Sequence, residues 1–262
     1  MPNPNLPLEL RKYANGAWHA ERGGAPAEMP VTLTVNGEAW LEFMCTPEHL
    51  DALAVGFLYN EGLIQEVSEV AGVHICEHGD NADVWLTHSA EKPAHWRRTS
   101  GCTGGVTAAD VKQMVADRRL QVPDGGARAK MTPESIGGLM GLLLSHQALY
   151  RTTGGVHTSV LSDGNVILVS AEDIGRHNTL DKIAGICLLE SIWPEPRILL
   201  TTGRVSSEMM QKAVRIGAAL VVSRTAASSL AVQIAEEAGI TLIGYCRSDR
   251  FTVYAHAECL QE

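Results

Sequence analysis

Alternation of apolar and polar residues dominates the first part of the chain and predicts β-structure there. Residues 31–43 form two extended runs around an Asn-Gly dipeptide, which favours a two-residue hairpin turn. A second pair of extended runs, within 73–87, surrounds the turn sequence HGDN. These patterns predict two hairpins in a β-rich N-terminal part.

A helix is predicted between the two hairpins. Thr46 is an N-cap candidate, because Pro47 after it suits the first position of a helix. Apolar residues then recur at helical spacing from Leu50 to Leu58, and Gly62 is placed to end the helix.

The second part of the chain alternates helical and extended patterns. Helices are expected over 132–150, around 181–190, and over 206–216 and 228–238, with a hairpin within 154–171 and strands over 198–201, 219–223 and 241–245. This order predicts a largely parallel sheet with an antiparallel first pair. Between the two parts, 92–105 is expected to be a loop, 108–119 a short helix and 121–130 a linker, which gives domains of residues 1–127 and 128–262.

Composition narrows the function classes. The chain has 262 residues, with 21 basic and 30 acidic side chains and a net charge of −9, which argues against an open surface for nucleic acid or anionic membrane. No apolar run is long enough to span a bilayer, and the N-terminus has no signal-peptide pattern, so we expect a cytoplasmic protein. Six cysteines are dispersed without a C-x-x-C pair, which is typical of free thiols.

Three predicted strands end in similar residues. The ends carry Thr202-Gly203-Arg204, Ser223-Arg224-Thr225 and Cys246-Arg247-Ser248-Asp249-Arg250. Ligands gather at the carboxyl ends of parallel strands, and arginine, hydroxyl groups and helix N-termini suit phosphate oxygens. The alternative is that the serines only cap helices and the arginines are surface residues. We expect an anionic, nucleotide-like ligand at these ends, although no Walker A or G-x-G-x-x-G motif is present.

A charged junction, EDIGRHN at 172–178, precedes a predicted helix. Arg176 and His177 are predicted to face the same cleft as the strand-end arginines. The alternative is that Asp173 or Asn178 is a helix cap and His177 a surface residue.

Cys102 is the candidate reactive thiol. It stands in the glycine-rich sequence SGCTGG, shortly after two arginines. A flexible backbone and nearby cations favour an accessible thiol of lowered pKa, whereas a lone cysteine is more often a buried structural residue.

Two metal patterns are incomplete. His74, Cys76 and His78 alternate on one predicted strand but have no evident fourth ligand for zinc. His256 and Glu258 match the start of a zinc-deaminase motif, but the required P-C-x-x-C does not follow. We therefore predict no protein-bound metal.

Four segments closely resemble one family. These are TGGVHTS (153–159), EDIGRHNTLDK (172–182), SSEMMQKA (206–213) and SLAVQIAEEAGITLIGYCRSDRFTVYAH (229–256). They are similar to the formate dehydrogenase accessory sulfurtransferases, the FdhD family, and the similarity extends over most of the chain.

The resemblance implies a sulfurtransferase of molybdenum cofactor maturation. Family members accept persulfide sulfur from a cysteine desulfurase and pass it to a molybdenum or tungsten bis(molybdopterin guanine dinucleotide) cofactor for formate dehydrogenase. Cys102 matches the persulfide cysteine. The expected cofactor-binding residues are Tyr245, Cys246, Arg247, Ser248, Asp249, Arg250, Gly203, Arg204, Ser223, Arg176 and His177. The family fold implies an α/β protein: a smaller β-rich N-terminal domain and a C-terminal three-layer α/β domain similar to cytidine deaminases without zinc. A homodimer is expected.

The sequence departs from the family pattern at one position. Well-studied members carry C-x-x-C where this chain has Cys102 followed by Gly105. A single persulfide on Cys102 remains chemically sufficient, because one thiol can hold and release the transferred sulfur. Gly105 nevertheless favours the rival hypothesis, a chaperone that binds and delivers the cofactor without sulfurating it.

Overall fold

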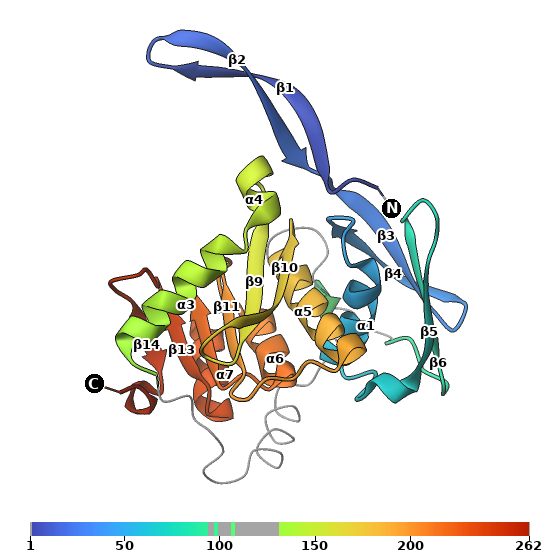
Figure 1. The fold of residues 1–262 in the computed structure, drawn as a ribbon. Coiled ribbons are helices and arrows are strands. Elements are labelled where there is room, and N and C mark those ends of the chain that lie inside the picture. The colour runs from blue at the N-terminus through green and yellow to red at the C-terminus, as the bar shows by residue number, and fades with distance from the viewer. Residues whose placement is uncertain (1, 94–96, 99–105, 108–130, 262) are drawn as a thin grey trace.

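The computed structural model describes residues 2–93, 97–98, 106–107 and 131–261, and its strands lie in four sheets (Figure 1). Cys102, Gly105, the predicted short helix 108–119, the predicted linker 121–130 and the proposed domain boundary lie outside the described residues. Part of the predicted loop 92–105 is extended, because β7 (Arg97–Arg98) pairs with β8 (Val106–Thr107).

The N-terminal sheet contains both predicted hairpins. Its strands, in spatial order, are β4 (Glu38–Cys45), β3 (Met29–Val35), β6 (Asn81–Leu86) and β5 (Val70–Ile75). The turn between β3 and β4 places Asn36 and Gly37 at φ 49° and 83°, the left-handed conformations that the Asn-Gly pair tolerates. The predicted β-rich N-terminal part is confirmed.

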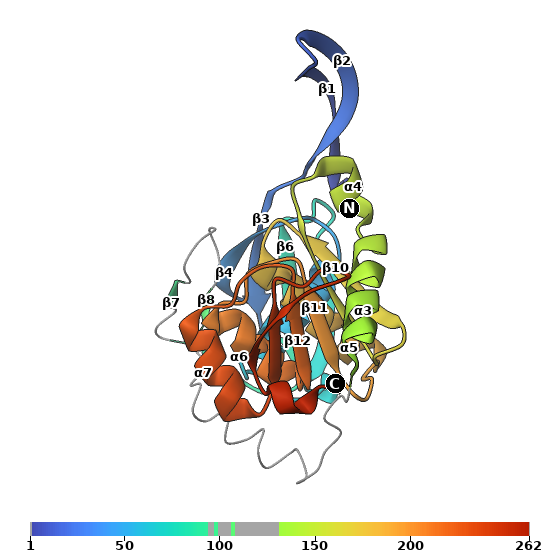
Figure 2. The same ribbon diagram turned by 90° about the vertical axis from the view of Figure 1, so that its left-hand side faces the viewer.

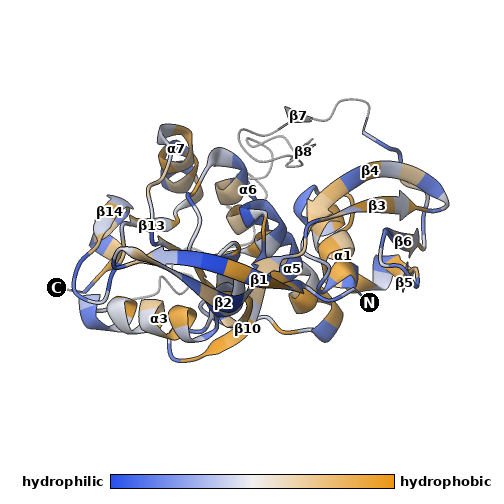
Figure 3. Ribbon diagram, turned by 90° about the horizontal axis from the view of Figure 1, so that it is seen from above, coloured by the Kyte–Doolittle hydropathy of each residue, from blue (hydrophilic) through white to orange (hydrophobic). Residues whose placement is uncertain are grey.

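Helix α1 (Leu50–Asn60) is hydrophobic over most of its length (Figure 3). Most of its residues are buried. The prediction that Thr46 caps it is wrong. The residue before the helix is His49, with φ 51° and no side-chain cap. Thr46 instead bonds across to the second part of the chain: its backbone N–H donates to Asp173 and its hydroxyl accepts from the N–H of Ile174. The Thr46 hydroxyl, which would cap the helix, is therefore occupied by a hydrogen bond to a residue far away in the sequence.

The second part of the chain forms a six-stranded sheet. Its strands, in spatial order, are β10 (Ile167–Asp173), β9 (His157–Ser162), β11 (Ile198–Thr201), β12 (Leu220–Ser223), β13 (Thr241–Gly244) and β14 (Thr252–Ala255). Strands β11, β12 and β13 are parallel, and the remaining neighbours are antiparallel. The predicted antiparallel first pair is confirmed. The prediction of a largely parallel sheet holds only for the centre, because β9 runs antiparallel to β11 and the unpredicted strand β14 runs antiparallel to β13.

Helices cover both faces of this sheet and give three layers (Figure 2). α3 (Pro133–Ser145) lies on one face, and α5 (Arg176–Glu190), α6 (Ser207–Ile216) and α7 (Ser229–Ala238) lie on the other. The helix predicted to run to about residue 150 is broken after Ser145, and α4 (Ala148–Thr153) follows as a separate element. Two 3₁₀ turns, η1 (Val67–Glu69) and η2 (Ala257–Cys259), complete the described helical elements.

The two parts of the chain pack together through α1 and α5. Gly56 faces the backbone of α5, and Gly185 faces the carbonyl of Ala52, so closely that a Cβ at either glycine would overlap backbone atoms. Asp181 of α5 forms a buried ion pair with Lys212 of α6. The carboxylate of Asp181 also accepts a hydrogen bond from the side-chain amide of Asn60 in α1.

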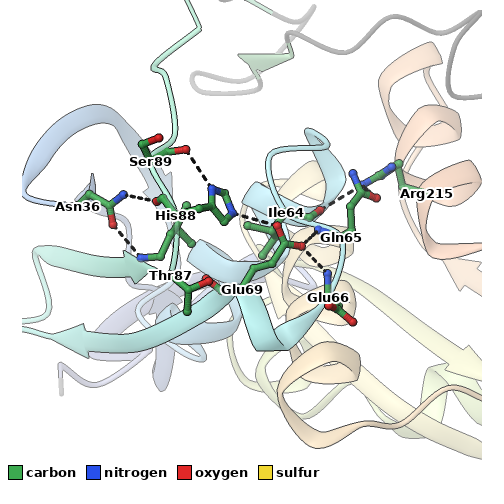
Figure 4. Close-up of polar contacts among 10 residues, drawn as sticks. Asn36, Ile64, Gln65, Glu66, Glu69, Thr87, His88, Ser89 and Arg215 are labelled. Atoms are coloured by element: carbon green, nitrogen blue, oxygen red, sulfur yellow. Dashed lines mark hydrogen bonds and ion pairs between the residues drawn. The ribbon is translucent and has the colours of Figure 1, made fainter.

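Side-chain contacts on the surface reinforce the same junction (Figure 4). Arg215 of α6 donates to the carbonyl of Ile64 and to the side chain of Gln65, just after α1. Nearby, Glu69 accepts from the backbone of 65 and 66 and pairs with His88 beyond β6. The first and second parts therefore share one packed body.

An N-terminal hairpin stands away from this body (Figure 1). β1 (Asn5–Ala14) and β2 (Ala17–Pro26) pair with each other only, and the hairpin was not predicted from the sequence. Its base lies against α4, with Pro26 beside Gly155. Across the helices of the described segments, none has the length and apolar content to cross a membrane.

Candidate functional site

A pocket of about 500 Å³ opens at the carboxyl ends of the parallel strands. Its walls come from the residue before α4, from α4 and the turn after it, from the start of β9, and from the loops that follow β11, β12 and β13. The lining residues are Gln147, Tyr150, Gly154, Gly155, Val156, His157, Thr202, Arg224, Thr225 and Arg247. This is the edge of an α/β sheet at which ligands commonly bind.

The three predicted strand ends meet at this pocket. Parallel pairing aligns Thr201 with Ser223 and Val222 with Ile243, so the residues that follow these strands converge. Thr202 comes from the first end, Arg224 and Thr225 from the second, and Arg247 from the third. Of the eleven residues expected to bind a cofactor, Arg247 is the one that lines the pocket.

Arg247 is held in place by backbone carbonyls. Its guanidinium donates hydrogen bonds of 2.7 Å to the carbonyl oxygens of Arg224 and Cys246. Its backbone N–H closes a turn by donating to the carbonyl of Arg250. A guanidinium oriented in this way keeps donors available for an anionic ligand in the pocket.

Ser223 and Gly203 hold the backbone at the strand ends next to these groups. The Ser223 hydroxyl donates to the carbonyl of Gly203 at 2.7 Å and accepts from the N–H of Thr225. A Cβ at position 203 would lie 2.9 Å from Cβ of Arg176, so glycine is required for the close approach of these two segments. Both residues shape the strand ends and do not line the pocket.

His157 is a pocket residue that the sequence reasoning did not single out, although it lies within TGGVHTS. Its Nδ1 atom lies 3.5 Å from the hydroxyl oxygen of Thr202. Burial lowers the pKa of His157, and the neighbouring cations Arg176 and Arg204 lower the pKa further. The imidazole therefore favours its neutral form beside several arginines.

Arg176 and His177 are both buried at the start of α5, where Arg176 lies against Gly203. The Nε2 atom of His177 lies 3.2 Å from the hydroxyl of Ser206, the N-cap of α6. Burial, followed by the charge of Arg176, lowers the pKa of His177 to about 3. The interpretation of His177 as a surface residue is therefore wrong.

The charged residues around the start of α5 mostly form a buried network of ion pairs and hydrogen bonds that stabilises the fold. Asp173 forms a fully buried ion pair with Lys182 at 2.7 Å and accepts a hydrogen bond from the side chain of Asn178. Lys182 also donates to the carbonyl of Thr46 in the N-terminal part. These contacts explain why so many polar residues occur beside apolar segments here.

Comparison with known proteins gives the family. A model of the FdhD/NarQ family matches residues 26–261. The chain belongs to this family. It is 36% identical to the sulfur carrier protein FdhD of Bacillus subtilis and 34% identical to that of Bacillus pumilus, over 97% and 99% of this chain and 97% and 100% of those proteins. The predicted family membership is confirmed.

A solved structure shares the fold. A Desulfotalea psychrophila protein assigned as a formate dehydrogenase accessory protein superimposes with a TM-score of 0.77, covering 99% of this chain and all of that one at 24% identity. The mixed α/β fold is thus found in a crystal structure as well. The expected similarity to cytidine deaminases stays a prediction.

The remaining FdhD-motif residues after β13 lie outside the pocket lining. Tyr245 has φ 52° and is half exposed, and Cys246 is buried, which raises the pKa of its thiol to about 11. Asp249 and Arg250 form an exposed ion pair, and the carbonyl of Ser248 packs against Gly137 of α3. Arg204 is also exposed.

The described thiols differ from a reactive cysteine. Burial raises the pKa of Cys45 and of Cys187 to about 12, which favours unreactive thiols. The burial of Cys187 agrees with its position on the predicted apolar stripe. Cys76 bonds to Asp80 and to the N–H of Asn81. In the segments that the structure describes, we find no cluster of three His, Cys, Asp or Glu side chains suited to a metal ion.

Proposed function

We propose that this chain is a sulfur carrier that acts in the maturation of formate dehydrogenase. The observation that carries the proposal is family membership joined to a pocket in which Arg224 and Arg247 converge at the carboxyl ends of parallel strands. Relatives that match nearly the whole chain are named sulfur carrier proteins. The client, formate dehydrogenase, is supported by the assignment of the Desulfotalea protein.

The sulfur is carried on Cys102 as a persulfide. The Cys102 thiolate attacks the outer sulfur of a persulfide on a cysteine desulfurase, whose own cysteine leaves as a thiolate. In the second step an acceptor supplies the electron pair for a new bond to the outer sulfur on Cys102. The S–S bond then breaks, and its electron pair stays on Cys102, so one thiol suffices.

The acceptor is a molybdenum or tungsten bis(molybdopterin guanine dinucleotide), which is a substrate here and not a resident group. The donors of the pocket suit its diphosphate: Arg247 and Arg224 carry positive charge, and Thr202 and Thr225 offer hydroxyl groups. Arg176 and His177 lie beneath the same edge of the sheet and are proposed to support the end of the ligand that accepts sulfur. A homodimer is part of the same proposal.

Gly105 supports a second candidate function, a cofactor-binding chaperone that delivers its cargo without sulfur transfer. Both candidates need the pocket, but only the sulfur carrier needs a thiol at position 102. The two are therefore separated by following sulfur on the protein.

Mass spectrometry after incubation with a cysteine desulfurase and cysteine tests the carrier. We expect the wild type to gain the mass of one sulfur atom, Cys102→Ala to gain none, and Cys187→Ala, which removes a buried thiol, to behave like the wild type. Formation of the adduct on Cys102→Ala would contradict the assignment of Cys102. No adduct on the wild type, together with normal nucleotide binding, would favour the delivery chaperone.

Titration calorimetry with GDP tests the pocket. Removing a charge-assisted hydrogen bond costs about 1.5–3 kcal/mol, so Arg247→Ala should weaken binding by about tenfold or more. Arg22→Ala removes an exposed arginine of the N-terminal hairpin and serves as the matched control. Equal affinity of Arg247→Ala and the wild type would remove the pocket from the proposal.

A further inference from the structure

The projecting N-terminal hairpin has an apolar face. In an antiparallel pair, directly opposite residues share a face, and side chains alternate between the two faces along each strand. Leu6, Leu8 and Leu10 therefore lie on one face, where they are 56%, 37% and 40% exposed. The residues opposite the first two are the small Ala25 and Gly23, so the leucine side chains dominate this surface, which we call the leucine face.

The other face of the hairpin carries polar side chains that already have partners. Glu9 pairs with Arg22 at 3.1 Å, and the guanidinium of Arg11 lies 5.3 Å from the ring centroid of Trp18. The hairpin stands away from the body in both side views, so its two faces meet the same solvent (Figures 1 and 2). A two-stranded hairpin alone is at best marginally stable, and an apolar face opposite a polar one is typical of strands that pack on another apolar surface.

The size of the hairpin favours a second copy of this chain as its partner. Two paired ten-residue strands give a face about 34 Å long and about 10 Å wide, or about 340 Å². One such face packed on another protein would bury about 700 Å² over both partners, which is below the roughly 1,200 Å² of a stable specific interface. Two copies that each place a hairpin on the other would bury about 1,400 Å², which is within the stable range.

The distribution of charge favours the same partner. The hairpin, residues 5–26, has three basic and two acidic side chains, which gives it a net charge of +1. Because the whole chain carries −9, the remaining residues carry −10. The hairpin is thus a cationic segment that suits the acidic body of a second copy, and a two-fold arrangement brings each hairpin to the body of the other chain.

We infer that the leucine face of the β1–β2 hairpin is a dimer interface, across which two copies of this chain exchange their hairpins. Each hairpin packs its leucine face on the body of the other copy and leaves its polar face in solvent. This inference rests on the homodimer of the proposed function and names the surface that forms it. The leucine face shares no residue with the lining of the pocket, so the dimer and the pocket can be tested separately.

Sedimentation velocity of the full chain over a range of concentrations tests the inference. The wild type should sediment as a dimer of the 28.2 kDa chain. Leu8→Glu places a carboxylate in the middle of the leucine face. It should raise the dissociation constant about a hundredfold, because each dimer contains the change twice and the loss of one buried leucine costs about tenfold or more. Leu8→Val keeps the face apolar and should remain a dimer.

Ala20→Glu is the matched control, because Ala20 pairs with Arg11 and so lies on the polar face. It adds the same charge to the same hairpin and should remain a dimer. Equal dissociation of Ala20→Glu and Leu8→Glu would overturn the assignment of the leucine face. A wild-type dimer that Leu8→Glu left unchanged would overturn the inference and leave the proposed homodimer intact. A monomeric wild type would contradict the homodimer and the inference together, and sulfur uptake by that monomer would leave the carrier function standing.

Discussion

Protonation of His177 should destabilise the protein in mild acid, and the size of the effect follows from its burial. The imidazole is 6% exposed, and burial with the nearby charge of Arg176 lowers its pKa from 6.5 to about 3. The unfolded chain then binds a proton near the ordinary pKa, whereas the folded chain does not. Stability is therefore fully present above that pKa and is lost as the pH falls toward the folded value.

The perturbation is His177→Gln, which removes the titration and keeps a polar side chain near Ser206. At about 1.4 kcal/mol for each pH unit below the unfolded pKa, the wild type should lose about 2 kcal/mol relative to the variant between about pH 7.5 and about pH 5. Urea unfolding of both proteins across this range measures the difference, in which the other titrating groups largely cancel.

His88 provides a control of opposite sign. The carbonyl of Ser89 and then the carboxylate of Glu69 raise the pKa of His88, so its contribution is present at low pH and is lost as the pH rises through the folded pKa. His88→Gln should therefore lose stability relative to the wild type as the pH falls, opposite to His177→Gln. A wild-type minus His177→Gln difference that did not change with pH would refute the view that the imidazole is buried in its neutral form.

Two further predictions concern the helix junction and the thiol loop. Gly185→Ala should destabilise the protein by about 3 kcal/mol or more in urea unfolding, because the new methyl group meets the backbone of α1, whereas Gly138→Ala, which meets no atom within 4 Å on α3, should stabilise it by about 0.5–1 kcal/mol. Equal effects of the two substitutions would contradict the close α1–α5 contact. Gly105→Cys should not speed sulfur release from Cys102 and should either behave as the wild type or trap a disulfide; activation of formate dehydrogenase in a strain lacking the endogenous protein measures this, and rescue by Gly105→Cys of an inactive wild type would count against the one-thiol mechanism.

Local sequence patterns determined most of the secondary structure. The Asn-Gly turn at 36–37 requires left-handed backbone, and Ser206 and Ser228 cap their helices as their hydroxyl groups favour. The boundaries of β11 agree with the predicted strand, because a short run of apolar residues between turn signals has few alternatives. Where local preference and burial agree, one segment is enough to specify its own structure.

Segments whose structure depends on distant partners were missed. One local signal was also overlooked: the N-terminal hairpin turns at Asn15-Gly16, with φ 53° and 81°, which is the same kind of turn sequence as Asn36-Gly37. Thr46 has the chemistry of a cap, but Asp173 and Ile174, more than a hundred residues away, take its groups. The break between α3 and α4 likewise depends on Glu172, which binds the free N–H groups of α4 from a neighbouring strand.

The candidate site shows the same division. The sequence by itself determined that arginines and small hydroxyl residues follow successive parallel strands, because strand direction places those ends at one edge of the sheet. Only the tertiary structure decided that Arg247 and Arg224 line the pocket while Arg204 and Arg250 are exposed, and that His157, Gln147 and Tyr150 complete its walls. Whether a side chain points into the pocket depends on packing between elements that are far apart in the sequence. That packing produces no periodic pattern of residues along the chain.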